Sequence, residues 1–506
     1  MITGKNYIGN NLSGTGNKIH KTFNSKSNNE NPTNFIEATS KEVNQAVDLA
    51  DEAFQVYKNV SGKEKSIFLN CIADKILALG NELIEVFMLE SGLPEARALG
   101  ERSRTIFQLQ SFAEMIKNDD WKNNIIEQSL PNRKPNPKPD LRKTFIPIGP
   151  IAVFTPSNFP LAYSSAGGDT ASALASGCSV VVKAHYMHFG TAELVSSAII
   201  EAVKKTGMPN GVYSNINGGV EVGQDLVKNL KIKGVGFTGS KSGGRSIYNI
   251  GANREEPIPV FSEMGSINPV IISPKFINSR LEEISDILSG SIMLGAGQFC
   301  TNPGLIIIIE NENTNNFTNN LIRSLSSKES QCMIHRNIKE SFLKNIEFLS
   351  NQEGMEVLSK TNNKLKGNFV SPQINSVFAK DFLNNSKMHQ EVFGPFSLIV
   401  KCENYDELIN VTKSLEGQLT GSLFAEESEL KEFSPVIDVL KDKVGRLVFN
   451  GVPTGVEVTE AMTHGGPYPA SSDSRFTSVG LDSIKRWVRP ITYQDWPFKL
   501  LPNDLK

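Results

Sequence analysis

One of the five cysteines, Cys300, lies where a thiol could do chemistry. It stands in residues 297–302 (GQFCTN), in a predicted loop between a helical stretch and an apolar strand. Cys71, by contrast, belongs to an apolar helical stripe. A lone cysteine is either a small buried hydrophobe or a nucleophile. Because a thiol with the ordinary pKa of about 8.5 is mostly protonated at neutral pH, the second role requires a nearby base or positive charge.

Glu263 and Asn158 follow predicted strands and are further candidate site residues. Glu263 closes the apolar run at residues 260–262 (VFS), and a carboxylate at the end of a buried strand is costly unless it is paired or used. Asn158 stands between two prolines in residues 155–160 (TPSNFP). A solvated strand end or a salt bridge would also explain Glu263, and a turn would explain Asn158.

Residues 236–244 (GFTGSKSGG) place glycines and serines between an apolar strand and a predicted helix. At such a junction, backbone N–H groups can approach a phosphate at the positive end of the helix. The dinucleotide fingerprint GxGxxG, the Walker P-loop and the zinc motif HExxH are absent from the sequence. Glycines that only form turns are common, so this junction alone leaves phosphate binding open.

The elements that must position these residues change from helices to a strand–helix alternation. Apolar periodicity predicts helices that start near Thr39, Ser61 and Pro94, the first two with capping-box spacing. From residue 151, short apolar runs alternate with helical stretches, which predicts a parallel sheet with ligands beyond the strand ends. Strands are predicted at 151–155, 180–183, 212–216, 235–238, 260–263, 269–272 and 305–309, and helices at 162–176, 190–205, 220–229, 245–250 and 280–294.

Two other parts of the chain are predicted to be extended or irregular. The first twenty or so residues and residues 25–33 are polar and are predicted to be loop or arm. Five prolines between residues 131 and 147 disfavour helix and central strand alike, which predicts an extended arm. Residues 490–501 are predicted to form another extended segment.

The composition of the 506 residues is ordinary for a folded protein, with 39% hydrophobic and 21% charged residues. The length predicts two to four domains of about 100–200 residues each. A formal net charge of −2 argues against nucleic acid or an anionic membrane as partner. We see neither an apolar run of membrane-spanning length nor a secretory signal, and an odd number of cysteines without CxxC disfavours disulfides and zinc. We therefore expect a soluble cytoplasmic protein.

The chain resembles the aldehyde dehydrogenase superfamily over nearly its whole length, in five motifs that keep the family's order and approximate spacing: FTPSNFPLAY, FTGSKSGG, SEMGS, GQFC and EVFGP. It is similar in particular to the branch of 2,5-dioxovalerate (2-oxoglutarate semialdehyde) dehydrogenases and NADP-linked fatty-aldehyde dehydrogenases, in SEMGSINPV, GQFCTNPGL, HGGPYPASSDSRFTSVG and RPITYQDWP. The resemblance implies an α/β fold with a Rossmann-type cofactor domain, an α/β catalytic domain and a small β oligomerisation arm.

The resemblance also implies a reaction and three catalytic residues. Cys300 would attack the aldehyde carbon, and Asn158 Nδ2 and the backbone N–H of Cys300 would stabilise the oxyanion of the thiohemiacetal. Hydride transfer to nicotinamide would leave a thioester, and Glu263 would activate the water that hydrolyses it to a carboxylate. No metal is required.

The cofactor implied is NAD or NADP, with Lys183 at the adenosine ribose. Many NAD-preferring relatives carry an acidic residue shortly after this lysine, whereas residues 183–188 read KAHYMH. The missing acid removes a repulsion against the 2′-phosphate of NADP, yet Tyr186 adds bulk and no arginine compensates, so the preference stays open. His185 and His188 are interpreted as loop residues rather than metal ligands. The implied cofactor residues are Thr155, Pro156, Lys183, His185, Gly239 and Ser240 (at the pyrophosphate), Glu391 (at the nicotinamide ribose) and Phe393.

The substrate implied is 2-oxoglutarate semialdehyde, whose distal carboxylate calls for an arginine. Arg104, on the third predicted helix, and Arg475, in a late loop, are the candidates, although an ordinary salt bridge would explain either. The superfamily's usual lysine after Glu-x-Gly-Gly is replaced by Asn268. A medium- or long-chain aliphatic aldehyde is the alternative substrate. The intact catalytic residues disfavour a non-catalytic binding protein on this fold and an enzyme that passes the thioester to coenzyme A.

The domain organisation implied by the resemblance has three parts. The cofactor domain would span residues 1–130 and 151–258, and the catalytic domain residues 259–455. An arm of residues 131–150 and 480–506 would bridge subunits, which fits a homodimer or homotetramer, because extended arms must satisfy their backbone groups outside their own core.

Overall fold

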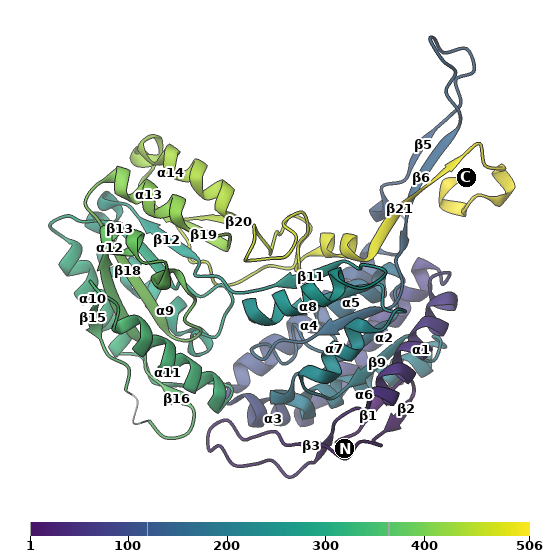
Figure 1. Ribbon diagram of the computed structural model, residues 1–506, viewed down its shortest axis with the longest axis horizontal. Coiled ribbons are helices and arrows are strands. Elements are labelled where there is room, and N and C mark those ends of the chain that lie inside the picture. The colour runs from purple at the N-terminus through teal and green to yellow at the C-terminus, as the bar shows by residue number, and fades with distance from the viewer. Residues whose placement is uncertain (1, 119, 363–364) are drawn as a thin grey trace.

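Two α/β halves, each built on a seven-stranded sheet, make up the body of the computed structural model (Figure 1). The structure describes residues 2–118, 120–362 and 365–506. A three-stranded sheet projects from the first half and ends the chain. The predicted α/β fold class is confirmed.

The sheet of the first half has a parallel centre in the order β11-β10-β7-β8-β9. The sequence predicted all five of these strands to within one residue at either end, because each is a short apolar run. Their bounds are β7 Ile151–Phe154, β8 Val180–Lys183, β9 Tyr213–Ile216, β10 Gly234–Thr238 and β11 Val260–Glu263.

The N-terminal segment extends this sheet. Strands β1 (Asn6–Ile8) and β2 (Asn11–Ser13) pair antiparallel, and Tyr7 of β1 pairs with Asn215 of β9. Strands β3 (Ile19–His20) and β4 (Phe35–Ile36) form a separate two-stranded ribbon. The prediction of loop or arm for the first twenty residues is therefore wrong for β1 and β2, because three-residue strands of mixed polarity give no readable alternation.

Helices cover both faces of the first sheet. Ala152 and Phe154 of β7 pack with one set, α1, α7 and α8, whereas Ile151 and Val153 pack with α2, α4, α5 and α6. Successive strand residues thus alternate between two apolar layers, as expected for a parallel sheet buried on both sides. The helices are α1 Ser40–Tyr57, α2 Gly62–Ala78, α3 Gly80–Ser91, α4 Glu95–Met115, α5 Gly168–Ser176, α6 Phe189–Thr206, α7 Val220–Lys228 and α8 Lys241–Ala252.

The helix starts at α1 and α2 are as predicted, since both capping boxes form. Helix α3 was not predicted; Gly80, with a φ of +58°, separates it from α2. Helix α5 begins at Gly168 instead of residue 162, because residues 162–167 (AYSSAG) form turns and bends. None of the described helices combines the length and the apolar character that crossing a bilayer requires.

The second half is built on the sheet β15-β17-β18-β13-β12-β19-β20, parallel except where β15 meets β17. Its strands are β12 Pro269–Ile272, β13 Leu305–Ile309, β15 Glu356–Ser359, β17 Gln373–Phe378, β18 Phe396–Cys402, β19 Gln418–Phe424 and β20 Val444–Phe449, with the small pair β14 Gln331–Cys332 and β16 Phe369–Val370 beside it. Its helices are α9 Pro274–Met293, α10 Thr314–Ser326, α11 Arg336–Ser350, α12 Ala379–Asn384, α13 Tyr405–Ser414 and α14 Leu430–Lys443.

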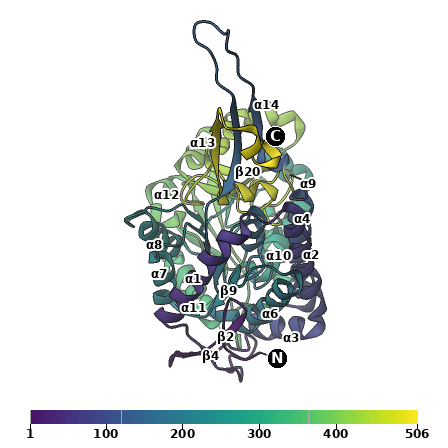
Figure 2. The ribbon, with the colours of Figure 1, turned by 90° about the vertical axis from the view of Figure 1, so that its right-hand side faces the viewer.

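The projecting sheet joins the proline-rich segment to the C-terminal segment (Figure 2). Strand β6 (Leu141–Pro147) pairs antiparallel with β21 (Val488–Gln494) on one side and with β5 (Ile125–Glu127) on the other. The long connection between β5 and β6 rises well clear of the body in this view. The projecting sheet therefore also includes β5, which lies within residues 1–130, the range that the resemblance assigned to the cofactor domain.

A return segment, residues 456–480, runs back from the second half along β11. Met264 donates its N–H to Ala470 O (2.8 Å), and Ser472 donates its N–H to Ser262 O (3.0 Å). The chain then enters the 3-10 helix η6 (Leu481–Trp487), whose Trp487 is fully buried in the core of the first half. This segment brings late residues to the C-terminal end of β11.

Candidate active site

The loop that carries Cys300 is tightly constrained. Three consecutive residues before it, Gly295, Ala296 and Gly297, have φ angles of +58°, +57° and +67°, a conformation that a residue with a side chain adopts only at a cost. A Cβ on Gly297 would lie 2.2 Å from the backbone carbon of Gly394. Backbone strain and close packing together hold the thiol in one place.

Asn268 anchors the same loop from within the protein. Its Nδ2 donates to the carbonyl oxygens of Cys300 (2.8 Å) and Asn302 (2.9 Å). Its Oδ1 accepts from the hydroxyls of Ser266 (2.9 Å) and Thr420 (2.8 Å). Asn268 is fully buried, so it supplies a rigid support at the position where the superfamily usually has a lysine.

A thiol, an imidazole and a carboxylate converge at the end of β11. Cys300 Sγ lies 3.5 Å from His464 Nε2, and His464 Nε2 lies 2.9 Å from Glu263 Oε1. The hydroxyl of Ser478 donates to the other carboxylate oxygen, Oε2. The side chains of His464 and Glu263 are 0% and 3% exposed, respectively, so bulk solvent barely reaches them.

The electrostatics of this group favour a protonated resting thiol. Burial raises the pKa of Cys300 well above its ordinary value, and the negative charge of Glu263 raises it further. Burial also acts to raise the pKa of Glu263, but its contacts with His464 and Ser478 outweigh burial and hold that pKa below its ordinary value. A reactive thiol requires a nearby base or positive charge. Here the ionised carboxylate of Glu263 is that base.

Asn158 reaches the Cys300 loop from the end of β7. Its Nδ2 donates to Gln298 O over 2.9 Å, which fixes the amide next to the thiol. Gln298 itself is buried and held by Gly295 O (3.0 Å) and by the N–H of Ile334 (3.0 Å). The second N–H of Asn158 remains to serve an oxygen in the cleft.

All the predicted catalytic and cofactor residues line one cleft of about 690 Å³. The volume is typical of sites for small molecules and cofactors. The cleft takes residues from both halves: the ends of β7, β8 and β10 contribute from one, and the Cys300 and Glu391 loops from the other. These residues are Thr155, Pro156, Asn158, Lys183, His185, Gly239, Ser240, Glu263, Cys300, Glu391 and Phe393.

The polar groups at the strand ends suit a dinucleotide. Thr155 Oγ1 is buried and has no hydrogen-bond partner among the described residues. Burial lowers the pKa of Lys183 to about 8, so an anionic or hydroxyl-rich ligand would relieve the cost of its desolvation. Ser240 caps α8 by accepting from the N–H of Gly243 (3.2 Å), which points the positive helix end at the cleft. These three groups fit the adenosine and pyrophosphate parts of NAD or NADP.

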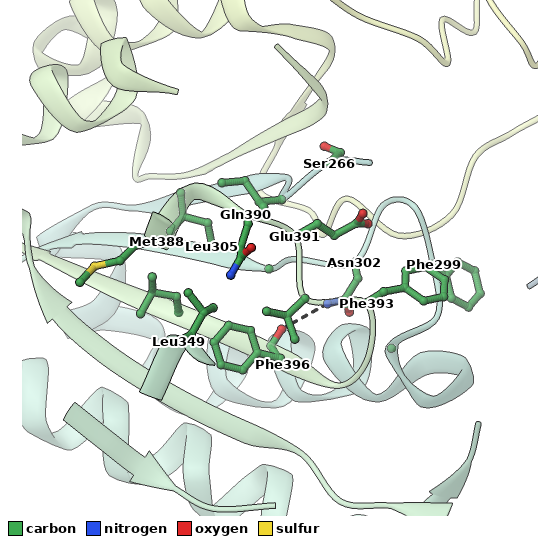
Figure 3. Close-up of a pocket in the computed structure, with 15 residues that line it drawn as sticks. Ser266, Phe299, Asn302, Leu305, Leu349, Met388, Gln390, Glu391, Phe393 and Phe396 are labelled. Carbon is green, nitrogen blue, oxygen red and sulfur yellow. Dashed lines mark hydrogen bonds between the residues drawn. The ribbon is translucent and has the colours of Figure 1, made fainter. Parts of the chain in front are cut away.

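The loop with Glu391 closes the other end of the cleft, against the Cys300 loop. Burial raises the pKa of Glu391 to about 7, and its carboxylate lies over Gly265, where a Cβ would come within 2.4 Å of Oε2. In Figure 3, Glu391 and Gln390 lie beside Asn302, whose Nδ2 donates to Phe396 O (3.3 Å). Residues of both loops, among them Phe299 and Glu391, line a small cavity of about 10 Å³, so little space separates the two loops.

His185 and His188 belong to the turn after β8, as interpreted from the sequence. Their rings stack, with centroids 5.6 Å apart, and His188 Nε2 lies 2.8 Å from Pro156 O. Burial lowers the pKa of His188 to about 4 and that of His185 well below its ordinary value. His185 lines the cleft beside Lys183, and His188 supports it from behind.

The two candidate substrate arginines differ. Arg475 is 80% exposed and forms a two-pronged ion pair with Asp473 (2.9 and 2.6 Å). The expectation that it serves the site is wrong, because its charge is already paired at the surface. Arg104 instead donates to Val456 O and, over 3.5 Å, to the hydroxyl of Tyr163, and Tyr163 lines the cleft.

Sequence reasoning missed His464, Ser478 and the role of Asn268. His464 is 164 residues from Cys300 in the chain, so nothing local links the two. The available signal was the motif HGGPYPASSDSRFTSVG, which begins at His464 and reaches past Ser478. Arg97 was also missed as a support: its guanidinium lies 4.5 Å from the ring centroids of both Phe159 and Phe299.

The glycine-rich junction after β10 faces a cleft that also holds the thiol of Cys300, the amide of Asn158 and the buried carboxylate of Glu263. This combination is that of an oxidoreductase that binds a dinucleotide and uses a thiol. The chain belongs to the aldehyde dehydrogenase family, whose model ("Aldehyde dehydrogenase family") matches residues 13–479. It is an enzyme of that family, and such enzymes use NAD or NADP.

Similar proteins are known in sequence and in structure. The chain is 43% identical, over 473 residues, to an alpha-ketoglutaric semialdehyde dehydrogenase of Acinetobacter baylyi and to alpha-ketoglutaric semialdehyde dehydrogenase 2 of Azospirillum brasilense, in each case over 93% of this chain and 90% of the relative. Among solved structures, methylmalonate-semialdehyde dehydrogenase from Oceanimonas doudoroffii superposes with a TM-score of 0.84 at 19% identity, over 98% and 99% of the two chains. Thermus 1-pyrroline-5-carboxylate dehydrogenase with bound NAD gives a TM-score of 0.83 at 19% identity, over 97% and 92%.

Proposed function

We propose that this enzyme oxidises 2-oxoglutarate semialdehyde to 2-oxoglutarate with NAD or NADP. The observation that carries the reaction is the convergence of Cys300, Glu263 and Asn158 on one wall of a cleft whose other residues fit a dinucleotide. The two relatives at 43% identity bear the name of the same semialdehyde, which supports this substrate.

Covalent capture of the aldehyde uses the groups around the thiol. Cys300 Sγ attacks the carbonyl carbon, and the thiol proton passes to Glu263, which His464 and Ser478 keep ionised. The new oxyanion accepts from Asn158 Nδ2 and from the backbone N–H of Cys300. One such donor is typically worth about 2.7–4 kcal/mol in the transition state.

Release of the product requires the Glu263 carboxylate to act as a base a second time. When bound, the nicotinamide ring supplies the acceptor for the hydride that leaves the captured carbon, and Cys300 is left as a thioester. Glu263 first releases the thiol proton to solvent and is again a carboxylate. It then removes a proton from water, which attacks the thioester carbon and expels the thiolate. The thiolate takes up a proton, and the carboxylate product leaves the cleft.

Two arginines near Tyr163, which lines the cleft, are suited to the distal carboxylate of the substrate. Arg104 and Arg446 (on β20) both bond carbonyls in residues 453–456, and the Nε of each is buried without a partner among the described residues. Burial lowers the pKa of Arg446, and the charges of Cys300 and Tyr163 oppose this shift, which supports a role for its guanidinium at this end of the cleft. Neither arginine forms an ion pair with a described residue, so both are available to a ligand carboxylate.

A second candidate substrate, a medium- or long-chain aliphatic aldehyde, is favoured by one observation. The cleft near Cys300 is lined by Phe159 and Tyr163, whose rings lie 4.9 Å apart. An apolar wall of this kind would also accept an alkyl chain.

Steady-state kinetics with matched substrates separate the two candidates. We expect 2-oxoglutarate semialdehyde to exceed succinic semialdehyde and a C6–C12 aldehyde series in kcat/KM. Arg104→Met and Arg446→Met should each lower kcat/KM for the carboxylated substrate about 10–100-fold and leave the aliphatic aldehydes nearly unchanged, while Arg475→Met serves as the control with no effect. Higher kcat/KM for aliphatic aldehydes in the parent enzyme would reverse the assignment.

We further propose that the site accepts both NAD and NADP. Residues 184–188 supply no acid to repel a 2′-phosphate. The acid whose charge acts on Lys183 is Glu37, and Glu37 is paired with Lys18 (2.9 Å) and His20 (2.6 Å). Kinetics with both cofactors test this, and a ratio of kcat/KM values beyond about 100 in either direction would contradict it.

The assembly that we propose is a homodimer or homotetramer joined through the projecting sheet, in a reducing cytoplasm. All five cysteines are free thiols, which suits such a compartment. Apolar side chains are exposed on the projecting sheet and its flanks, as expected for a contact surface: Ile125, Ile126, Leu130, Trp496 and Phe498. Light scattering should give a molar mass of two or four times 55.5 kDa. The substitution Ile126→Asp should lower this molar mass. A monomeric parent enzyme would overturn the proposal.

A further inference from the structure

The catalytic wall also has the composition of a transition-metal site. One ligand atom each from Cys300, His464 and Glu263 lies within 4.8 Å of the other two. In residues 2–118, 120–362 and 365–506, this is the one cluster of three such groups. Glu263 and His464 are buried, Cys300 is partly exposed, and both Cys300 and Glu263 line the cleft.

The distances between the ligand atoms are close to those of tetrahedral zinc. With Zn–S of about 2.3 Å and Zn–N and Zn–O of about 2.0–2.2 Å, tetrahedral angles require about 3.6 Å between S and N and about 3.4 Å between N and O. The observed separations are 3.5 Å for Cys300 Sγ to His464 Nε2 and 2.9 Å for His464 Nε2 to Glu263 Oε1. Of these two pairs, only the second must open, by about 0.5 Å. The sulfur and the carboxylate oxygen lie within 4.8 Å of each other.

We propose that Zn²⁺ binds reversibly to Cys300 Sγ, His464 Nε2 and a carboxylate oxygen of Glu263, and thereby inhibits the enzyme. The inhibition rests on the proposed function, because it requires that Cys300 is the nucleophile. Zinc is no part of the reaction itself: it occupies the group that the reaction needs.

The chemistry of binding is a simple exchange of a proton for a metal ion. The Cys300 thiol releases its proton to solvent, and the sulfur lone pair, the Nε2 lone pair and the carboxylate each form one bond to Zn²⁺. One thiolate and one carboxylate balance the two positive charges, and a water from the cleft completes the fourth position. The sulfur lone pair is then unavailable to a carbonyl carbon. A sulfur–nitrogen–oxygen set selects zinc over Mg²⁺ and Ca²⁺, which prefer oxygen alone.

Two features make the binding reversible. The hydrogen bond between His464 and Glu263 must open, and the other ring nitrogen of His464, Nδ1, has no partner among the described residues. Zinc-bound histidines ordinarily donate this second N–H to an acceptor, which strengthens the site. The Ser478 hydroxyl provides that outer support for the carboxylate alone. We therefore expect a chelator to restore activity fully.

Binding is measured on the full-length, metal-free enzyme without aldehyde, with Co²⁺ as a spectroscopic probe and Zn²⁺ as its competitor. Co²⁺ should give a thiolate-to-metal charge-transfer band at one equivalent, and Zn²⁺ should remove it. Cys300→Ala should abolish the band, and His464→Asn should weaken Zn²⁺ binding at least about 100-fold. The matched controls Cys71→Ala and His389→Asn, which alter a thiol and an imidazole outside the cluster, should bind as the parent does.

Activity assays with a chelator present separate this proposal from the proposed function. Metal-free enzyme that oxidises the semialdehyde but shows neither the band nor inhibition by Zn²⁺ overturns the zinc site and leaves the function intact. A band that survives in Cys300→Ala, or an equal inhibition by Mg²⁺, also overturns it. Metal-free enzyme that gives the band but oxidises no aldehyde overturns the function and retains the site.

Discussion

The two ends of the cleft differ in how their polar groups are satisfied. At the Cys300 end, the protein itself provides the partners: Asn268 holds two carbonyls of the loop, and His464 and Ser478 hold both oxygens of Glu263. At the dinucleotide end, Thr155 Oγ1 lacks a partner among the described residues, and Lys183 is desolvated at the cleft wall.

This difference separates preorganised chemistry from adaptable binding. Groups that must face a developing charge work best when they are fixed before the reaction starts. Groups that bind a cofactor can leave their hydrogen bonds to be completed by its ribose and phosphates. Changes at the Cys300 end should therefore alter kcat and folding stability, and changes at the dinucleotide end should alter the cofactor KM.

The largest expected effect is that of Cys300→Ala. Removal of the nucleophile should lower kcat by at least about 10⁴-fold, because no other described thiol lines the cleft. The assay is NAD(P)H formation, and calorimetry should show unchanged cofactor binding. Residual turnover near that of the parent enzyme would remove Cys300 from the mechanism.

The second-largest expected effect is that of Glu263→Gln, which should lower the steady-state kcat about 10²–10⁴-fold. The amide cannot take a proton, so thioester hydrolysis should slow more than thioester formation. Rapid-mixing kinetics should then show a burst of NAD(P)H. In the parent enzyme, the pKa of Glu263 lies below its ordinary value of 4.5, so the carboxylate stays ionised as the pH falls to that value. An acid limb of kcat well above pH 4.5 would contradict Glu263 as the titrating base.

Asn268→Ala tests the fixed end without touching the reacting atoms. Two buried carbonyls, those of Cys300 and Asn302, would lose their donor, so the free energy of unfolding should fall by about 2–4 kcal/mol. We expect a lower Tm and a lower kcat, with the cofactor Kd unchanged. Asn316→Ala, which removes an exposed hydrogen bond to Asn313, is the control and should cost under about 0.5 kcal/mol.

The smallest expected effect is that of Lys183→Met, which should raise the cofactor KM about tenfold with little change in kcat. Because the pKa of Lys183 is about 8, the ammonium is lost as the pH rises through that value. The cofactor KM of the parent enzyme should therefore rise above about pH 8, and that of the variant should stay flat. A variant with the same pH dependence as the parent would exclude Lys183 from cofactor binding.

The parts of the fold that the sequence predicted are those with a strong local pattern. Strands β7 and β8 are almost wholly apolar, β9 to β11 are short and partly apolar with a few polar residues, and α1 and α2 start at complete capping boxes. Strands β1 and β2 were missed because three residues of mixed polarity carry no period, and their place at the sheet edge is fixed by contacts more than 200 residues away, such as Tyr7 with Asn215.

The site was predictable where a side chain follows a strand or stands in a recognised motif, as for Cys300, Glu263, Asn158 and Lys183. It was not predictable where two distant segments meet. The contact of His464 with Cys300 spans 164 residues, and its geometry exists only after both halves have packed. The prediction for Arg475 failed for a different reason. Its partner, Asp473, is two residues away, and the sequence does not tell whether such a neighbour forms an ion pair with it.

The order in which the polypeptide is made gives the return segment a particular consequence. Every strand of the two large sheets precedes residue 450, whereas both partners of the Glu263 carboxylate, His464 and Ser478, follow it. A ribosome-bound chain that has already emerged up to β20 thus holds its thiol and its cleft but lacks the groups that set the charge of its base. Competence for catalysis is acquired with the stretch made after β20, together with Trp487, which packs this stretch into the core of the first half.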